Sequence, residues 1–174
     1  MPARLPWIKR TWKFDFPVEL FPDIMERLRG TPARITEMLR EVPADVLTSR
    51  EKEGTWSIQE NVGHLLDVES LWTGRLDDFL AGETGLRPAD MTNRATHQAS
   101  HNDRPFAALL MAFRTERGRF LDRLDGLDDA DFARTAQHPR LGTPMRLVDL
   151  CLFVADHDDY HLARILELIR FHLG

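Results

Sequence analysis

The sequence predicts an all-α protein, a four-helix bundle. Three observations carry this prediction: four segments repeat their apolar residues with the helical period, none shows sustained strand alternation, and a long connection over residues 81–102 joins the second and third segments. Antiparallel helix neighbours need loops of only about 2–8 residues. The longer connection can carry the chain back along the bundle, which would leave helices two and three parallel with their starts close together.

The first predicted helix runs from about Val18 to Val42, with its apolar residues on one face. The sequence "RGTP", residues 29–32, interrupts it. Pro32 has no N–H to donate to the carbonyl four residues earlier, so we expect a kink or a break there. Thr31 as N-cap, with Pro32 at the first helical position, would restart the helix.

The second predicted helix begins at "WSIQE", where Ser57 as N-cap and Glu60 three residues later form a capping box. Its apolar stripe runs from Ile58 to Leu80. Gly82 follows the stripe directly and is a typical end for a helix.

The third predicted helix starts near "NDRPF", with Asn102 or Asp103 as its cap and Pro105 in its first turn, and it ends at "GLDD". The fourth opens at "GTPMR", with Thr143 as its N-cap and Pro144 following, and it extends to about residue 172. Its apolar stripe is unusual because it includes two histidines.

Composition and charge narrow the class of protein. The chain has 174 residues, 43% of them hydrophobic and 29% charged, which is typical of a single soluble domain. We expect an N-terminal aromatic arm, residues 1–17, and a single bundle domain, residues 18–174. The formal net charge of −5 argues against nucleic acid as a partner. No apolar run approaches the length of a membrane span, and the N-terminus lacks the apolar stretch of a signal peptide.

The only cysteine, Cys151, lies in the apolar run "LVDLCLFVA". We interpret it as a small buried side chain rather than a nucleophile. With one cysteine no disulfide can form within the chain, and a cytoplasmic location fits.

The segment "DHDDYHLARI", residues 156–165, places two histidines four residues apart on the stripe of the fourth helix. Residues at this spacing have Cβ atoms about 5–6 Å apart, so the imidazoles of His157 and His161 can face one atom. A catalytic zinc-type site usually takes three protein ligands and keeps one position open. His64, at the edge of the buried face of the second helix, is the best third ligand. The alternative is that these are core histidines held by hydrogen bonds.

Acidic residues near the histidines have two interpretations. Asp156, Asp158 and Asp159 are candidates to accept a hydrogen bond from the second ring nitrogen of a ligating histidine, although solvent exposure is the simpler interpretation for two of them. Glu69 falls on the apolar stripe of the second helix and needs a partner, for which an arginine such as Arg164 is the simplest choice.

A second pair of histidines, His97 and His101, lies in the long connection just before the third helix. If helices two and three are parallel, this pair comes near His64 and could line the substrate entrance; exposed loop and cap residues are the simpler interpretation. Two metal motifs are rejected. "HDDYH" has the zincin spacing without the glutamate or the downstream ligand, and the glutamate–histidine pairs of a ferritin-like di-metal site are missing from the sequence.

Two segments resemble the DinB/YfiT-like family: "WSIQENVGHLLDVESLW", residues 56–72, and "VADHDDYHLARILEL", residues 154–168. The resemblance extends from the first helix to the last, although only these segments are distinctive. It implies a four-helix bundle with up-down-down-up topology, a long crossover between helices 2 and 3, and a metal site formed by His64, His157 and His161. It also implies a divalent ion, nickel or zinc, and a homodimer. Family members with an assigned activity are transferases or isomerases that use a small thiol such as bacillithiol or mycothiol.

These observations lead to a divalent-metal-dependent enzyme that acts on a small-molecule substrate, either as a hydrolase or as an S-transferase that uses a low-molecular-weight thiol. An ion held by three neutral imidazoles lowers the pKa of a bound water or thiol. Glu60, one turn before His64, is a candidate base as well as a cap. The alternatives are a non-catalytic metal-binding or stress-related bundle, and a helical interaction domain that dimerises through its aromatic arm.

Overall fold

The computed structural model describes residues 3–174 and is built from four long helical segments. They are α1 (Phe21–Leu39), α3 (Ile58–Asp67) followed directly by α4 (Glu69–Ala81), α6 (Phe106–Asp125) and α7 (Leu147–Leu173). The connections hold the short elements η1 (Trp7–Lys9), η2 (Val18–Leu20), α2 (Ala44–Thr48), α5 (Arg94–Gln98), η3 (His101–Asp103), η4 (Asp129–Ala133), β1 (Thr135–Gln137) and β2 (Pro144–Arg146). The predicted all-α four-helix bundle is confirmed, with one addition, the antiparallel hairpin of β1 and β2.

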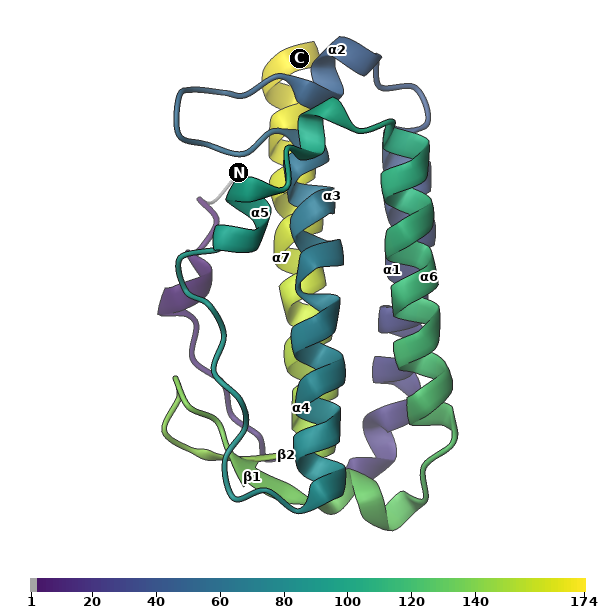
Figure 1. Cartoon of the computed structure of the whole chain (residues 1–174), viewed down its shortest axis with the longest axis vertical. Helices are drawn as coiled ribbons and strands as arrows, with labels where there is room; N and C mark the ends of the chain where they lie inside the picture. The colour runs from purple at the N-terminus through teal and green to yellow at the C-terminus, as the bar shows by residue number, and fades with distance from the viewer. Residues whose placement is uncertain (1–2) are drawn as a thin grey trace.

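The helices run in the directions that a long crossover produces. In Figure 1, α1 and α7 run from the bottom of the view to the top, whereas α3–α4 and α6 run from the top to the bottom. Between α4 and α6, residues 82–105 climb the length of the bundle and carry α5. The start of α6 therefore lies beside the start of α3, where the Gln59 amide donates to the carbonyls of His101 (2.5 Å) and Arg104 (2.7 Å).

The first long helix, α1, continues through Pro32, so the predicted break with a new start at Thr31 is wrong. Pro32 leaves the carbonyl of Leu28 without its helical donor. The guanidinium of Arg117, from α6, donates to that carbonyl instead, at 3.2 Å. The Thr31 hydroxyl does not cap a helix, because it donates to the carboxylate of Asp158 at 2.7 Å. A side chain from another helix thus replaces the hydrogen bond that the proline removes.

The predicted capping box at the start of α3 is confirmed. The Ser57 hydroxyl accepts from the N–H of Glu60 at 3.1 Å, and the Glu60 carboxylate accepts from the N–H of Ser57 at 2.8 Å. Gly82 follows α4 in the left-handed region, with φ of 74°, as predicted. A single residue, Val68, separates α3 from α4, which places His64 in the last turn of α3.

The starts of the third and fourth long helices differ from their predictions. Asn102 and Asp103 lie in η3, and Pro105 itself occupies the N-cap position of α6. α7 begins after β2 rather than at "GTPMR", because residues 144–146 pair with residues 135–137 in the hairpin. Its first turn is capped by Asp149, whose carboxylate accepts from the N–H of Arg146 at 2.8 Å. Threonine and proline suit turns as well as helix starts, so the pattern could not decide between them.

A buried ion-pair cluster of Glu69, Arg117 and Asp158 crosses the centre of the bundle. Arg117 is 1% exposed and donates to Glu69 on α4 at 2.6 Å and to Asp158 on α7 at 2.5 Å. The predicted ion pair of Glu69 is confirmed, but its partner is not Arg164, which pairs with Glu51. Burial raises the pKa of Glu69 to about 7 against the opposing effect of the Arg117 charge. Apolar core residues fill the bundle on both sides of the cluster.

The described part of the N-terminal arm, residues 3–17, packs against the bundle. Trp7 lies edge-on to Phe153 of α7 with ring centroids 4.9 Å apart, and Trp12 lies at the same distance from Phe153. Cys151, on the same helix as Phe153, is buried, as predicted, and burial raises the pKa of its thiol to about 12. The arm therefore covers a stretch of α7 that includes one of the histidines, His157, whose ring lies 5.1 Å from Trp7.

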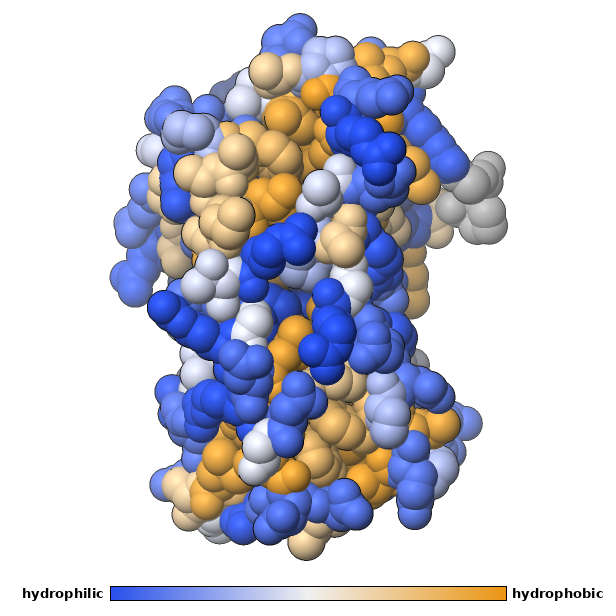
Figure 2. All heavy atoms as spheres, turned by 90° about the vertical axis from the view of Figure 1, so that its right-hand side faces the viewer, coloured by the Kyte–Doolittle hydropathy of each residue, from blue (hydrophilic) through white to orange (hydrophobic). Residues whose placement is uncertain are grey.

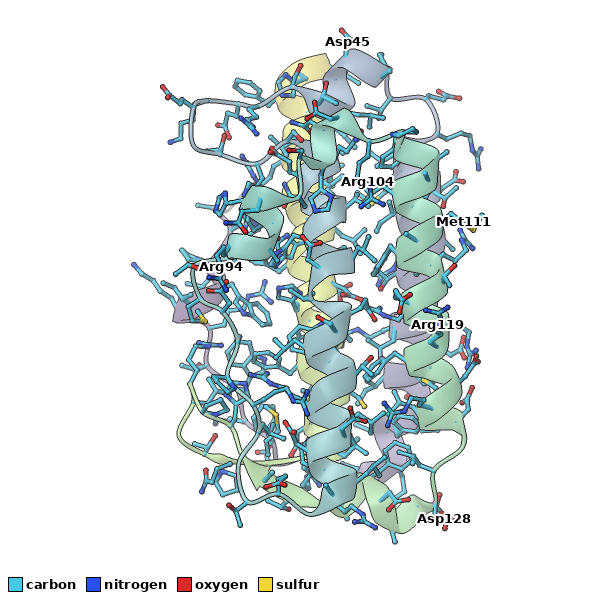
Figure 3. The ribbon with its side chains drawn as sticks, in the orientation of Figure 1. Asp45, Arg94, Arg104, Met111, Arg119 and Asp128 are labelled. Atoms are coloured by element: carbon cyan, nitrogen blue, oxygen red, sulfur yellow. The ribbon has the colours of Figure 1, made fainter. Side chains whose placement is uncertain are left out.

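The side of the bundle formed by α1 and α6 faces the viewer in Figure 2. Hydrophilic side chains cover most of it, and hydrophobic ones gather towards its two ends. On α6, Met111 and Arg119 lie on the outer side (Figure 3), and Met111 is 61% exposed. Among residues 3–174, no helix combines the length and the apolar character needed to cross a membrane.

Candidate metal centre

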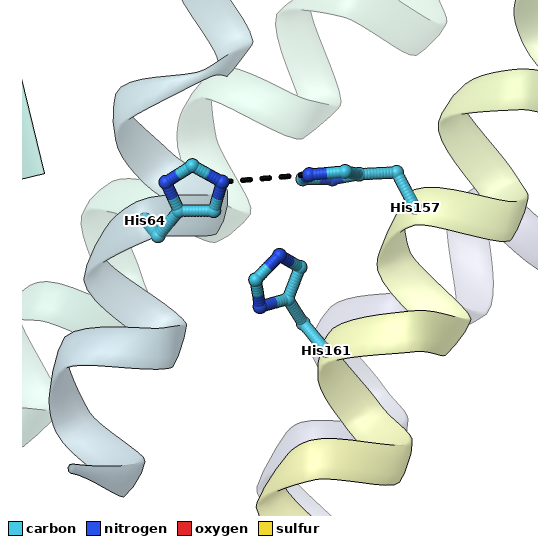
Figure 4. Close-up of side chains that lie close together, drawn as sticks. All are labelled: His64, His157 and His161. Carbon is cyan, nitrogen blue, oxygen red and sulfur yellow. Dashed lines mark hydrogen bonds between the residues drawn. The ribbon is translucent and has the colours of Figure 1, made fainter. Parts of the chain in front are cut away.

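Three histidines from two helices meet in the interior. His64 comes from the last turn of α3, and His157 and His161 come from successive turns of α7 (Figure 4). Nε2 of His64 lies 3.4 Å from Nε2 of His157, and one ring nitrogen of each histidine lies within 4.8 Å of the other two. All three side chains are buried. The structure therefore brings together the histidines that the sequence selected.

The hydrogen bonds around His161 determine which of its nitrogens is free. Nδ1 of His161 lies 2.9 Å from Oδ1 of Asn61. The other end of the Asn61 amide donates to the carbonyl of Ser57 at 2.7 Å, which fixes its orientation. Because an amide oxygen only accepts, Nδ1 of His161 carries the proton, and Nε2 of the neutral ring keeps its lone pair. Figure 4 shows one nitrogen of this ring directed towards the other two histidines.

His64 and His157 point a nitrogen at each other. Nδ1 of His64 lies 3.0 Å from the hydroxyl of Thr96 on α5, to which the ring can donate while its Nε2 keeps a lone pair. Nδ1 of His157 is buried and has no hydrogen-bond partner within the described residues. Two neutral rings that face each other in this way can share only one proton, whereas a cation between them accepts a lone pair from each.

These features fit a divalent cation better than a set of core histidines. The rings of His64 and His161 can donate from Nδ1 to Thr96 and Asn61, which leaves the lone pairs of their Nε2 atoms for a cation to accept. Burial lowers the pKa of His64 and of His157 to about 3 and lowers that of His161 well below its usual value. All three rings are therefore neutral at pH 7, the form that ligates zinc or nickel. Three neutral nitrogen donors are also the set that leaves a coordination position open.

The aspartates beside the histidines do not orient them. Asp158 belongs to the buried ion-pair cluster, while Asp156 and Asp159 accept from Arg27 at 2.7 and 2.5 Å. Side chains next to each other in a helix point in different directions, so the neighbours of His157 face α1 and α6 rather than the histidine rings. The expectation that one of them accepts from a ligand is wrong.

Two residues that hold the histidine rings were missed by the sequence analysis. Asn61 lies three residues before His64 on the same side of α3, so helical spacing offered a signal for it. Thr96 belongs to the short helix α5 in the long connection, where no periodic pattern indicated which side chain would reach the site. Thr96 is nevertheless only 5% exposed.

The histidines form part of the wall of a cavity of about 840 Å³. Helices α3, α4 and α7 form one side of it, and residues 87–96 of the crossover form another. Its aromatic lining includes Trp56, 4.7 Å from the ring of His64, and Trp72, 5.6 Å from the ring of His157. Ligand pockets typically have roughly 300–1,000 Å³. The cavity therefore has room for a small organic substrate beside the histidines.

The second histidine pair does not form the predicted lining of an entrance. His101 is 1% exposed, and its Nε2 lies 2.8 Å from the carboxylate of Asp67. Its ring packs on the backbone of Gly63, where an added Cβ would lie 2.3 Å from ring atoms. His101 therefore fixes the crossover against α3. His97 is exposed, with its ring 5.7 Å from that of Trp56.

The carboxylate of Glu60 is occupied by its neighbours. It accepts from the Arg50 guanidinium at 2.9 Å as well as from the N–H of Ser57. It is 8% exposed and does not belong to the cavity wall. These contacts account for its capping role, and its role as a base stays a prediction.

The fold and the site together define a four-helix bundle with three buried histidines beside a substrate-sized cavity. The chain belongs to the DinB superfamily, whose family model matches residues 27–165. Among solved structures it is similar to YfiT from Bacillus subtilis, described as a probable metal-dependent hydrolase with an unusual four-helix bundle topology. The two share 24% sequence identity over 92% of each chain, with a TM-score of 0.76, a likeness that shows the fold. A comparison with curated protein sequences gave no match.

Proposed function

We propose that this protein is a divalent-metal-dependent enzyme with His64, His157 and His161 as ligands and zinc or nickel as the ion. The observation that carries the proposal is the pair of facing Nε2 atoms of His64 and His157, 3.4 Å apart in the wall of the cavity. The description of YfiT as a probable metal-dependent hydrolase supports it.

His64, His157 and His161 would hold a divalent ion, which would supply a nucleophile at neutral pH by lowering the pKa of a bound water or thiol. The side chains of the protein prepare the site for it. Asn61 and Thr96 hold the rings of His161 and His64 so that the Nε2 lone pairs face inwards. The aromatic rings of Trp56 and Trp72 give the cavity beside the histidines an apolar lining.

The nucleophile is water in a hydrolase and a small thiol in an S-transferase. Cys151 does not supply a thiol, because it is completely buried. A transferase therefore needs a low-molecular-weight thiol from solution, which agrees with the resemblance to thiol-dependent enzymes.

Turnover of small esters, amides and alkylating electrophiles by the zinc- or nickel-loaded protein, with and without a small thiol, tests the proposal. His64→Ala and His157→Ala are expected to abolish turnover. His97→Ala removes an exposed histidine outside the site and is the matched control, which keeps full turnover. Saturation of the rate by thiol identifies a transferase, and thiol-independent turnover identifies a hydrolase.

A metal-stabilised bundle without catalysis is the competing function. In that case the ion contributes folding free energy, and removing it lowers the melting temperature. One tightly bound ion per chain, with no turnover in any of these reactions, would support this alternative over the enzyme.

A further inference from the structure

Two arginines and a histidine line the same cavity as the metal centre. Arg75 projects from α4 and is 2% exposed. His138 and Arg140 come from the turn that joins β1 to β2, which lies beside the lower half of the bundle in Figure 1. Nη1 of Arg75 lies 3.1 Å from Nε2 of His138. We call these three residues the cationic cluster.

The charges of the cationic cluster are not neutralised by carboxylates. Neither Arg75 nor Arg140 takes part in an ion pair within residues 3–174, and Nη2 of Arg140 is buried without a hydrogen-bond partner there. The carboxylate that acts most strongly on Arg75 is Asp78, and both of its oxygens are bound by Arg87 at 2.7–3.1 Å. Two guanidinium groups thus line the cavity without a carboxylate in direct contact, and the rings of Trp72 and Phe153 are their aromatic neighbours.

The carboxylates that line the cavity are engaged elsewhere. Asp67 accepts from His101 at 2.8 Å, and Asp90 accepts from the hydroxyl of Thr92 and from the N–H of Arg94. They therefore do not serve as the missing counter-charges.

Donors outnumber acceptors in the cationic cluster. Nδ1 of His138 accepts from the backbone N–H groups of Arg140 (3.3 Å) and Leu141 (3.2 Å). A neutral imidazole has one lone pair, so Nε2 of His138 then carries a proton. Nη1 of Arg75 also carries only protons, yet it lies 3.1 Å from that nitrogen. Two donors that converge in this way are satisfied by a shared acceptor placed against both.

We infer that the cationic cluster binds the carboxylate of a small-molecule substrate. A carboxylate offers two acceptor oxygens with roughly four lone-pair sites, which suits the converging donors of Arg75 and His138 and the unpartnered guanidinium nitrogen of Arg140 in the same cavity wall. Its binding also supplies the missing negative charge. That the bound carboxylate belongs to a substrate rests on the proposed function, whereas the binding of a carboxylate by the cationic cluster does not depend on it.

The distances between groups along the cavity indicate the chemical character of the rest of the substrate. The indole of Trp72 lies 5.6 Å from the ring of His157 and 5.6 Å from Cζ of Arg75. One aromatic ring therefore separates the metal centre from the cationic cluster, and Phe153 adds a second apolar surface beside His138. A substrate that spans both ends carries a carboxylate, a short apolar segment and an electrophilic group.

Binding of benzoate and of its neutral analogue benzamide to the metal-loaded protein tests this inference. Trp7, Trp56 and Trp72 line the cavity, so their fluorescence reports occupancy. We expect benzoate to bind at least about tenfold more tightly than benzamide, because hydrogen bonds to charged groups are stronger than neutral ones. Arg140→Gln and Arg75→Gln should each remove most of this preference. Arg140 lies in a half-buried turn, so we expect Arg140→Gln to fold. It therefore tests the inference even if Arg75→Gln does not fold.

Controls separate the cationic cluster from the metal centre. Arg119→Gln removes a surface arginine whose side chain is 70% exposed (Figure 3) and should leave the preference intact. His157→Ala should also retain it, because the cluster does not need the ion. If His157→Ala loses the preference while Arg140→Gln and Arg75→Gln keep it, the anion binds to the metal and the inference is overturned. Equal binding of benzoate and benzamide by the wild-type protein would also overturn it.

Phenyl phosphate distinguishes the two common oxyanions. Weaker binding than that of benzoate supports a carboxylate substrate, and tighter binding overturns the carboxylate in favour of a phosphate ester. If the protein binds no metal but benzoate still binds through Arg140, the proposed function fails while the anion site stands.

Discussion

Replacing Arg117 by methionine removes the centre of the buried ion-pair cluster. Methionine has a similar length and no charge. The substitution leaves the carboxylates of Glu69 and Asp158 buried without their cation, and it leaves the carbonyl of Leu28 without a donor. Pro32 has no N–H, so the usual helical donor to that carbonyl is missing.

The expected loss of stability is large. Removing one partner of a buried ion pair costs about 3–5 kcal/mol, because the remaining charge is buried and uncompensated. The unpaired carbonyl adds roughly 1 kcal/mol or more. We therefore expect Arg117→Met to lose at least about 3 kcal/mol of unfolding free energy. This is a large part of the total, because the unfolding free energy of a domain is typically about 5–15 kcal/mol.

The loss also depends on pH, with a definite sign. Burial already raises the pKa of Glu69 to about 7 in the presence of Arg117. Without the guanidinium, the folded-state pKa of Glu69 rises further above its unfolded value, because the opposing effect of the Arg117 charge is lost. When the pKa of a carboxyl is higher in the folded state than in the unfolded state, the group costs no stability at pH values below its unfolded-state pKa. It destabilises the fold as the pH rises through its folded-state pKa. Arg117→Met should therefore lose more stability at about pH 8 than at about pH 5.

Urea unfolding followed by circular dichroism at both pH values measures this loss. Arg119→Met, on the exposed side of the same helix, is the matched control and should change the unfolding free energy by less than about 0.5 kcal/mol. A variant that also replaces Glu69 and Asp158 by leucine should recover much of the loss. A loss below about 1 kcal/mol, or the same loss at both pH values, would refute the reasoning.

Three further predictions concern the metal centre and the crossover. Asn61→Ala removes the acceptor of Nδ1 of His161 and should weaken zinc binding about 10–100-fold in a competition titration with a chelator; unchanged affinity would contradict the role of the amide. Gly63→Ala places a Cβ 2.3 Å from the ring of His101 and should lower the melting temperature by several degrees, whereas an unchanged value would show that the ring moves freely. Metal-free protein should lose unfolding free energy as the pH falls from 6.5 towards 3, because His64, with a pKa lowered to about 3, stays neutral while the unfolded chain takes up protons; equal stability at pH 7 and pH 5 would contradict this.

The bundle could be predicted from the sequence because the spacing of apolar residues along each helix reflects their burial in the core between the helices. The stripe that contains Ile58 and the capping box of Ser57 and Glu60 correctly placed the second helix, and its end at Gly82 followed from backbone conformation alone. The break predicted at Pro32 was wrong because the donor that replaces its hydrogen bond, Arg117, comes from another helix. No local pattern contains that information.

The site was predictable where helical spacing brings ligands together and unpredictable where tertiary contacts do. His157 and His161 share a face of α7, and the antiparallel packing of α3 beside α7 brings His64 opposite them. Thr96 reaches His64 from the crossover, a segment without periodicity. Arg140 was also invisible, because the hairpin that carries it consists of two three-residue strands whose turn resembles a helix start.

The most direct test of the metal centre is the metal content of protein prepared without a polyhistidine tag, measured by plasma mass spectrometry. Wild type and the control His97→Ala should each carry about one zinc or nickel ion per chain, and His64→Ala and His157→Ala should carry none while circular dichroism shows an intact helical fold. Wild-type protein that contains no metal, and takes up neither zinc nor nickel when they are offered, would contradict the account and leave three buried histidines in a helical bundle.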